Sequence, residues 1–477
     1  MIFGLFKKDQ TADTVFVNGN IYTQDADMPW AEAVACRDGE VIYVGNSQEA
    51  EKFAGSDTYV IDLAGKYMLP GLINTHSHPA LRIFEDAYIS IPENYDIDDI
   101  LGMMSDYIFN NQEEQVYFGF GFGNNVLKGM TQEEATAKLD EICMDKPVML
   151  LSKGEGVLWI NNFALEQVRA AAQEDGILNI SLEYMLQVVA PFDYEELQNK
   201  TVGLVSEYCS RGFTSIFNAG TPEFMDNVYQ DVIINMHQQD MIKQRYFDSF
   251  QVARNIKPEA AINHLMQKKT KTTELDDYMH CNHLKLTISQ DDDSQEISVE
   301  NQSEMMEKAC ERGFDIHLDV LDRKAFTECM ESITAIRNAG YRKNNFILAC
   351  DEEIRNGNEE FCMEEMCLEN LSFQNSTIGE PSNEYMALEG ASSVEEILDR
   401  FTIDAAVSLG ISDKLGSIEV GKFADFAIFE ENPFNVIKPG FFKKLSADMT
   451  VLAGNVVYDV EEDNMQEWYD LMSGMQL

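Results

Sequence analysis

The feature that most constrains the fold is an alternation of apolar, strand-like runs with helical stretches through the centre of the chain. We expect strands at 67–75, 147–152, 213–218, 245–252, 283–288, 313–318 and 345–350, and helices at 131–143, 192–211, 223–240, 300–312 and 322–339. Pro258 is expected to open a further helix. This alternation is typical of parallel βα units. The centre therefore predicts an α/β barrel, which carries its working residues at the C-terminal ends of its strands.

Both ends of the chain differ from the centre, because they are rich in short strands and turns. Near the start, strand-like runs flank Asn18-Gly19 and Asp38-Gly39, which are two-residue hairpin signals. Near the end, residues 416–459 contain further turns and strands. The simplest architecture joins residues 1–66 and 416–477 in one small composite β-sandwich. The barrel then occupies 67–415, with an insertion at about 92–200.

The chain is strongly acidic, with 83 Asp and Glu residues against 35 Lys and Arg and a formal net charge of −48. Nucleic-acid phosphates and anionic membrane surfaces would be repelled, so neither is expected as a partner. Two alternatives remain for the charge itself. It steers a cationic ligand, or it forms a solvated surface, and the spread of acids along the whole chain favours the second.

The sequence predicts a cytoplasmic protein. No apolar run reaches the roughly 18–20 residues of a membrane span. The start, Met1 to Asp9, places its charges after a short apolar patch, which is the reverse of a signal peptide. The 9 cysteines include no CxxC pair, and this pattern favours reduced thiols.

Two histidines, His76 and His78, end the first apolar run of the centre. In an extended strand, residues two apart point to the same side, so both imidazoles would meet at one point. A divalent metal needs such a pair of donors at a strand end. The alternative is two surface histidines in a turn before Pro79. The chain holds only 7 histidines, and this pairing favours the metal site.

Several separated segments, taken in order, resemble one known family. They are VNGNIYT at 17–23, LPGLINTHSH at 69–78, YFGFG at 117–121, WINNFAL at 159–165, GFTSIFNAG at 212–220, and the tail from Thr402 through Asp425. The chain is similar in these segments to the metal-dependent amidohydrolases, in the branch called amidohydrolase 3 or YtcJ-like. The resemblance covers nearly the whole chain.

The resemblance implies a TIM-like (β/α) barrel flanked by a β-sandwich made from both chain ends. It implies one or two divalent metal ions, with zinc the expected ion, and hydrolysis of a non-peptide C–N bond in a small-molecule amide or cyclic amide. The expected ligands are His76 and His78, the strand-five histidine His317, and the strand-four lysine Lys285 as a carbamate that bridges two ions. The oligomeric state is left open, with a homodimer the form that related barrels often take.

Two of these residues keep a simpler alternative. Lys285 could be an ordinary lysine with its stem along the sheet, and His317 could be a structural histidine.

The second half of the family pattern is substituted. The strand-six position reads Ala349-Cys350-Asp351, so Cys350 is the candidate metal ligand there, or else a small buried hydrophobe. The strand-eight aspartate is missing, and Glu380 is the remaining candidate for the catalytic base, or else an exposed acid. The segment 351–401 is short, which predicts that strand seven or its helix is reduced.

These substitutions support a rival hypothesis. A catalytically degenerate relative would keep the fold and part of the metal site, and would bind a small molecule or a partner protein. Removing one essential group typically costs several orders of magnitude in rate. Whether Cys350 and Glu380 lie near the three histidines therefore distinguishes the two hypotheses.

Overall fold

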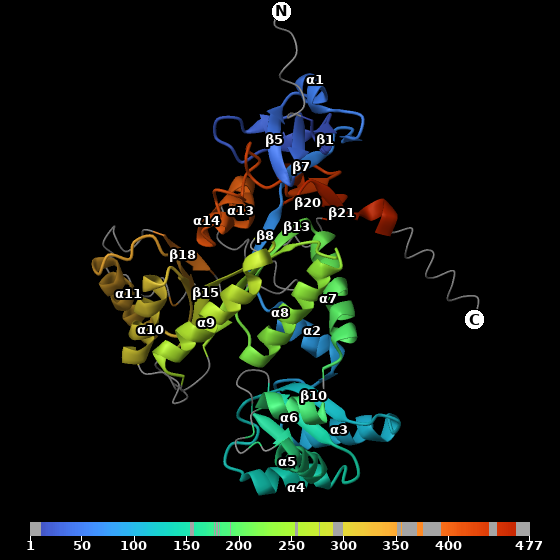
Figure 1. The fold of residues 1–477 in the computed structure, drawn as a ribbon, viewed down its shortest axis with the longest axis vertical. Helices are drawn as coiled ribbons and strands as arrows, with labels where there is room; N and C mark the ends of the chain where they lie inside the picture. Colours follow the sequence, from blue (N-terminus) through green and yellow to red (C-terminus); the bar gives the residue numbers. More distant parts are fainter. Residues whose placement is uncertain are drawn as a thin grey trace, which may run out of the picture. The chain divides into compact units, whose positions relative to one another are not determined.

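The computed structural model describes residues 11–152, 157–175, 177, 180, 182–190, 192–252, 256–275, 277–289, 299–350, 354, 370–374, 393–437 and 446–463. The chain divides into two compact units (Figure 1). The first contains residues 1–78, 205–220 and 240–477, and the second contains 79–204 and 221–239.

A seven-stranded sheet forms the centre of the first unit. Its order is β18 (Leu371–Gln374), β17 (Phe346–Ala349), β16 (Asp315–Val320), β15 (Met279–Ile288), β14 (Arg245–Gln251), β13 (Phe213–Asn218) and β8 (Leu72–Ser77). Every neighbouring pair is parallel. This is the expected TIM-like (β/α) barrel architecture, seen in seven of its strands. The expected reduction concerns 351–401, of which the structure describes 354, 370–374 and 393–401.

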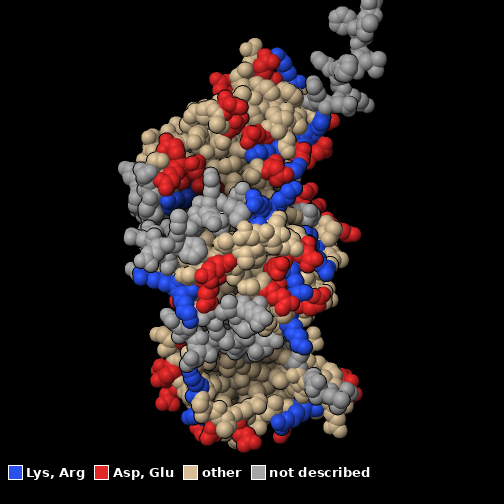
Figure 2. Space-filling model, turned by 90° about the vertical axis from the view of Figure 1, so that its left-hand side faces the viewer, with Lys and Arg blue, Asp and Glu red and all other residues tan. Residues whose placement is uncertain are grey.

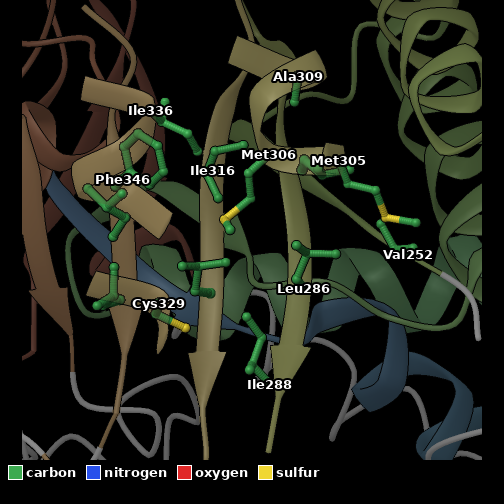
Figure 3. Close-up of a cluster of buried hydrophobic side chains, with 14 of the residues drawn as sticks. Val252, Leu286, Ile288, Met305, Met306, Ala309, Ile316, Cys329, Ile336 and Phe346 are labelled. Atoms are coloured by element: carbon green, nitrogen blue, oxygen red, sulfur yellow. The ribbon is translucent and has the colours of Figure 1, made fainter. Parts of the chain in front are cut away.

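Helices cover one face of this sheet. They are α9 (Pro258–Thr272), α10 (Val299–Glu311) and α11 (Arg323–Asn338), close to the expected ranges. Figure 3 shows Leu286 of β15 and Ile316 of β16 among Met305 and Met306 of α10. Because strand side chains alternate between faces, the residues next to Leu286 and Ile316 point to the other, inner face. Lys285 and His317 are such residues.

The β-sandwich is built from two further sheets, and the second of them combines strands from both ends of the chain. One has the order β5 (Glu40–Gly45), β4 (Ala33–Arg37), β1 (Thr14–Val17), β6 (Tyr59–Asp62). The other has the order β21 (Asn455–Asp459), β20 (Met449–Leu452), β19 (Phe426–Phe429), β7 (Tyr67–Pro70), β2 (Asn20–Tyr22), β3 (Trp30–Ala31). A shared core of buried side chains, including Phe16 and Phe426, packs them together.

Two local expectations need correction. The expected hairpin at Asn18-Gly19 does not form, because β1 and β2 belong to different sheets. The expected single strand 67–75 is two strands, β7 in the sandwich and β8 in the barrel. The break falls at Gly71, where a Cβ would overlap the side chain of Thr214. The connection from β7 of the sandwich to β8 of the barrel therefore depends on a glycine that packs closely against β13.

The remaining elements of the first unit are short. They are α1 (Ser47–Ala50), η1 (Glu51–Phe53), η2 (Thr273–Leu275), α13 (Val394–Phe401), α14 (Ile403–Ser408) and α15 (Pro433–Val436).

The second unit contains a four-stranded sheet in the order β12 (Leu158–Ile160), β11 (Val148–Ser152), β10 (Tyr117–Phe122), β9 (Ile89–Ser90). Its helices are α2 (Pro79–Ala87), α3 (Ile97–Asn110), α4 (Gln132–Asp140), α5 (Asn162–Asp175), α6 (Leu182–Val189), the greater part of α7 (Tyr194–Cys209), and α8 (Glu223–Gln238). A separate hydrophobic core that includes Phe122 and Trp159 holds this unit together.

The surface carries the acidic side chains that the composition predicts. Figure 2 shows acidic side chains in scattered groups on the visible face, with lysines and arginines among them. Among the described residues, no helix combines the length and the apolar character needed to cross a bilayer.

Candidate metal centre

His76 and His78 lie together at the end of β8, as their spacing predicts. Their ring centroids are 5.3 Å apart. His76 is buried, with 2% of its surface exposed, and His78 is partly buried. The backbone N–H of His76 donates to Asn74 Oδ1 at 3.1 Å, which ties the strand end to its own preceding residue.

A backbone carbonyl fixes the tautomer of His78. Its Nδ1 lies 2.8 Å from the carbonyl oxygen of Gly220. A carbonyl oxygen can only accept, so Nδ1 carries the proton and donates it. In the neutral ring, Nε2 then keeps a lone pair. Metal-binding histidines commonly have this arrangement, in which the second ring N–H is held by a carbonyl or a carboxylate.

His317 of β16 completes a group of three imidazoles. Its ring centroid lies 5.5 Å from that of His76, and the ring also contacts Phe217 at 5.2 Å. The Oγ of Ser249 lies 3.3 Å from Nδ1, so the other nitrogen, Nε2, is the one directed toward the group. Burial, reinforced by the positive charge of Lys285, lowers the pKa of His317 well below its ordinary value. The ring is therefore neutral at pH 7, which is the form that binds metals.

Asp319, which the sequence analysis did not predict, lies beside His317. Its Oδ1 is 3.7 Å from His317 Nε2. One nitrogen of His76, one of His317 and one oxygen of Asp319 all lie within 4.8 Å of one another. The Asp319 side chain is 19% exposed, although its Oδ1 is buried. Burial raises the pKa of Asp319, but Lys285 and His76 outweigh it and hold this pKa below its ordinary value.

Lys285 of β15 lies beside His317, because the two residues are in register on neighbouring strands. Its side chain is buried, and its Nζ forms an ion pair with Asp319 Oδ2 and donates to the carbonyl oxygen of Ala219. Burial lowers the pKa of Lys285, and the charge of Asp319 opposes that shift.

The structure separates Cys350 from this group. Phe346, Leu348 and Cys350 pack in the cluster under α9, α10 and α11, whereas Ile347 belongs to a cluster on the inner face. Asp319 is in register with Ala349 rather than with Cys350. The prediction that Cys350 is a metal ligand is therefore corrected: this residue does not lie with the histidines. Its thiol lies on the helix-covered face. Glu380, the predicted base, lies outside the described residues.

The atoms of the group fit a divalent metal. His317 Nε2 and Asp319 Oδ1 are buried and have no hydrogen-bond partner among the described residues. Two such atoms cost free energy if nothing satisfies them. Imidazole nitrogen and carboxylate oxygen are the donors that zinc accepts. A cation between them would satisfy both.

Comparison with known proteins places this geometry in context. A model of the amidohydrolase family matches residues 59–348 and 372–458. The exoenzymes regulatory protein AepA of Pectobacterium carotovorum is 26% identical over 240 residues, which cover 46% of this chain and 51% of that protein. The N-substituted formamide deformylase of Arthrobacter pascens is 27% identical over 165 residues, which cover 34% of this chain and 30% of that protein. The matches thus span about half of these relatives or less.

Solved structures share the fold at low sequence identity. A metal-dependent hydrolase from Pyrococcus horikoshii superposes with a TM-score of 0.57 at 17% identity, covering 90% of this chain and 99% of that one. An adenosine deaminase from Xanthomonas campestris with bound zinc superposes with a TM-score of 0.53 at 13% identity, covering 98% of this chain and 99% of that one.

Proposed function

The chain belongs to the amidohydrolase family, and on that premise we propose that it is a metal-dependent hydrolase acting on a non-peptide C–N bond of a small molecule. The observation that carries the proposal is the pair of buried, unsatisfied atoms, His317 Nε2 and Asp319 Oδ1. His76, His317 and Asp319 each offer a ligand atom, and these three atoms lie within 4.8 Å of one another. Zinc is the ion we propose.

Each residue of the site has a proposed role in binding the metal ion or shielding it. His76, His78 and His317 would hold the ion. The ring of His76 lies 5.3 Å from that of His78 and 5.5 Å from that of His317, centroid to centroid. A ring nitrogen of His76 and one of His317 lie within 4.8 Å of each other. Such an ion supplies a nucleophile at neutral pH and polarises the carbonyl of an amide. Phe217 packs against His317 and excludes water from one side of the ring.

The proposed substrates are amides and cyclic amides. The relative from Arthrobacter pascens is named an N-substituted formamide deformylase, which supports adding N-substituted formamides to the panel. A carboxylate is needed to carry the proton to the leaving nitrogen. Glu380 remains the predicted residue for this step.

One observation favours the rival function, a binding module without catalysis. Ala349 occupies the inner-face position at the end of β17, where the family pattern led us to expect a ligand. A site with fewer ligands could hold a metal or a small molecule without turning it over.

A substrate panel tests the two functions together. Protein loaded with zinc, manganese or cobalt is offered N-acyl amino acids, N-substituted formamides and cyclic amides. Hydrolysis is measured with and without a chelator. We expect metal-dependent turnover that falls at least about 10³-fold in the His76→Ala, His78→Ala double variant. A loaded protein that turns over no member of the panel favours the binding module. Turnover that survives in the double variant contradicts the metal mechanism.

A further inference from the structure

We propose that Asp319 is the carboxylate ligand of this metal centre, and that Lys285 acts as a free amine that positions it. The inference rests on the proposed function, since it concerns the same site. It departs from the family resemblance, which assigns Lys285 a carbamate and takes its aspartate from strand eight.

The backbone places Asp319 where a ligand is required. Asp319 follows His317 by two residues on β16, so both side chains project from the same face. The separation between Asp319 Oδ1 and His317 Nε2 is 3.7 Å. Two ligands of one tetrahedral zinc ion, each bound at about 2.1 Å, lie about 3.4 Å apart. A small movement would therefore bring both atoms onto one ion.

The two oxygens of Asp319 have separate partners. Oδ2 is held by the Nζ of Lys285, whereas Oδ1 has no hydrogen-bond partner among the described residues. A carboxylate fixed through one oxygen presents the other in a defined direction. Ligating carboxylates are commonly held in this way by a neighbouring donor.

The contacts of Lys285 require N–H donors. Its Nζ faces two acceptors, the carboxylate of Asp319 and the carbonyl oxygen of Ala219. An amine offers donors to both. A carbamate would add negative charge next to the Asp319 carboxylate, and like charges at this distance repel.

The stem of Lys285 lies close to Gly220. A Cβ added to Gly220 would lie 3.0 Å from Lys285 Cγ and 3.3 Å from Gln251 Cβ. The stem is thus closely packed on the side of β13.

Metal affinity of the purified protein tests the proposal without any substrate. Zinc and cobalt are titrated against a chromophoric chelator in the wild type and in Asp319→Asn, Lys285→Met and Asp322→Asn. The last variant is the control, because it removes the same charge beyond the same strand. We expect Asp319→Asn to weaken binding about 100-fold and Lys285→Met to weaken it about 10-fold, with Asp322→Asn close to the wild type. Circular dichroism checks that each variant folds.

Two spectroscopic readouts separate a ligand from a structural residue. The visible spectrum of the cobalt form should change in Asp319→Asn and in Lys285→Met, because the ligand field changes. After exposure to ¹³C-bicarbonate, the wild type should show no ¹³C carbamate signal. A carbamate signal that disappears in Lys285→Met would overturn the proposal.

The outcomes also distinguish this inference from the proposed function. If Asp319→Asn binds metal as tightly as the wild type while His76→Ala and His317→Ala lose it, only the inference on Asp319 fails. If the folded wild type binds neither zinc nor cobalt, the proposed function fails with it.

Discussion

The carbonyl oxygen of Gly220 accepts a hydrogen bond from His78 Nδ1 at 2.8 Å, and the neighbouring carbonyl of Ala219 accepts one from Lys285. The turn after β13 therefore orients side chains from two other strands. Gly220 has φ of +94°, which favours glycine, and a Cβ there would press on Lys285.

This turn predicts the effect of Gly220→Ala. Backbone strain of about 1–3 kcal/mol and displacement of Lys285 should move both carbonyls. We expect metal affinity to fall about 10-fold or more. The matched control is Gly340→Ala, which also has positive φ, at +106°, but has no atom within 4 Å of the added Cβ. Equal metal affinity in the two variants would show that the turn does not orient the site.

Ser249 is predicted to set the direction of His317. Its Oγ lies 3.3 Å from Nδ1. Ser249→Ala removes this contact and keeps both ring nitrogens of His317, so only the orientation of the ring is affected. We expect zinc affinity to fall about 10-fold, measured by chelator competition. Ser303→Ala, which removes a hydroxyl of α10 that pairs with Ser332 of α11, serves as the control. The role is excluded if both variants bind zinc equally.

A buried ion pair is predicted to hold the sandwich to the barrel. Arg245 Nε of β14 lies 2.7 Å from Asp425 Oδ2, and both side chains are almost fully buried. Asp425→Asn leaves the guanidinium without its counter-charge, so the free energy of unfolding should fall by about 3–5 kcal/mol in urea titration. The exposed pair Lys52–Glu49 is the comparison, and Lys52→Ala should cost less than about 1 kcal/mol. A loss from Asp425→Asn no larger than that of the exposed pair would refute this role.

Buried thiols predict a loss of stability at alkaline pH. Burial raises the pKa of Cys209 and of Cys310 from an ordinary value of 9.0 to about 12. Between about pH 9 and pH 12 the unfolded chain releases these protons while the folded protein keeps them. The unfolded state then binds fewer protons, so stability falls as pH rises, by up to about 1.4 kcal/mol per pH unit for each thiol.

Urea unfolding under reducing conditions at pH 8 and pH 10.5 measures this slope. The double variant Cys209→Ala, Cys310→Ala should lose less stability between the two pH values than the wild type does. An unchanged difference would mean that these thiols do not cause the alkaline loss.

Much of the site followed from local pattern. His76 and His78 lie at the end of β8, and His317 lies within β16, three residues before its end. Parallel pairing brings the carboxyl ends of these strands to the same edge of the sheet. The same reasoning could have found Asp319. It stands two residues after His317, just as His78 follows His76, so the spacing that pairs the two histidines also places Asp319 beside His317.

Three features could not be predicted from the sequence, because each depends on contacts between distant parts of the chain. The face of the sheet on which Cys350 lies depends on strand parity, because a difference of one residue places a side chain on the opposite face. Gly71 gave no signal that it separates two strands of different sheets, because its role depends on Thr214, far away in the chain. The contacts of Lys285 depend on the turn after β13, which no motif describes. Long-range packing, rather than local propensity, decided each of these.

The metal content of the purified protein tests the central claim most directly. The wild type and the His76→Ala, His317→Ala double variant are loaded with zinc, passed through gel filtration and analysed for metal per chain by mass spectrometry. We predict at least one zinc ion per wild-type chain and background zinc in the double variant, with both proteins folded. Folded wild-type protein without bound zinc, or equal zinc in the two proteins, would contradict the account.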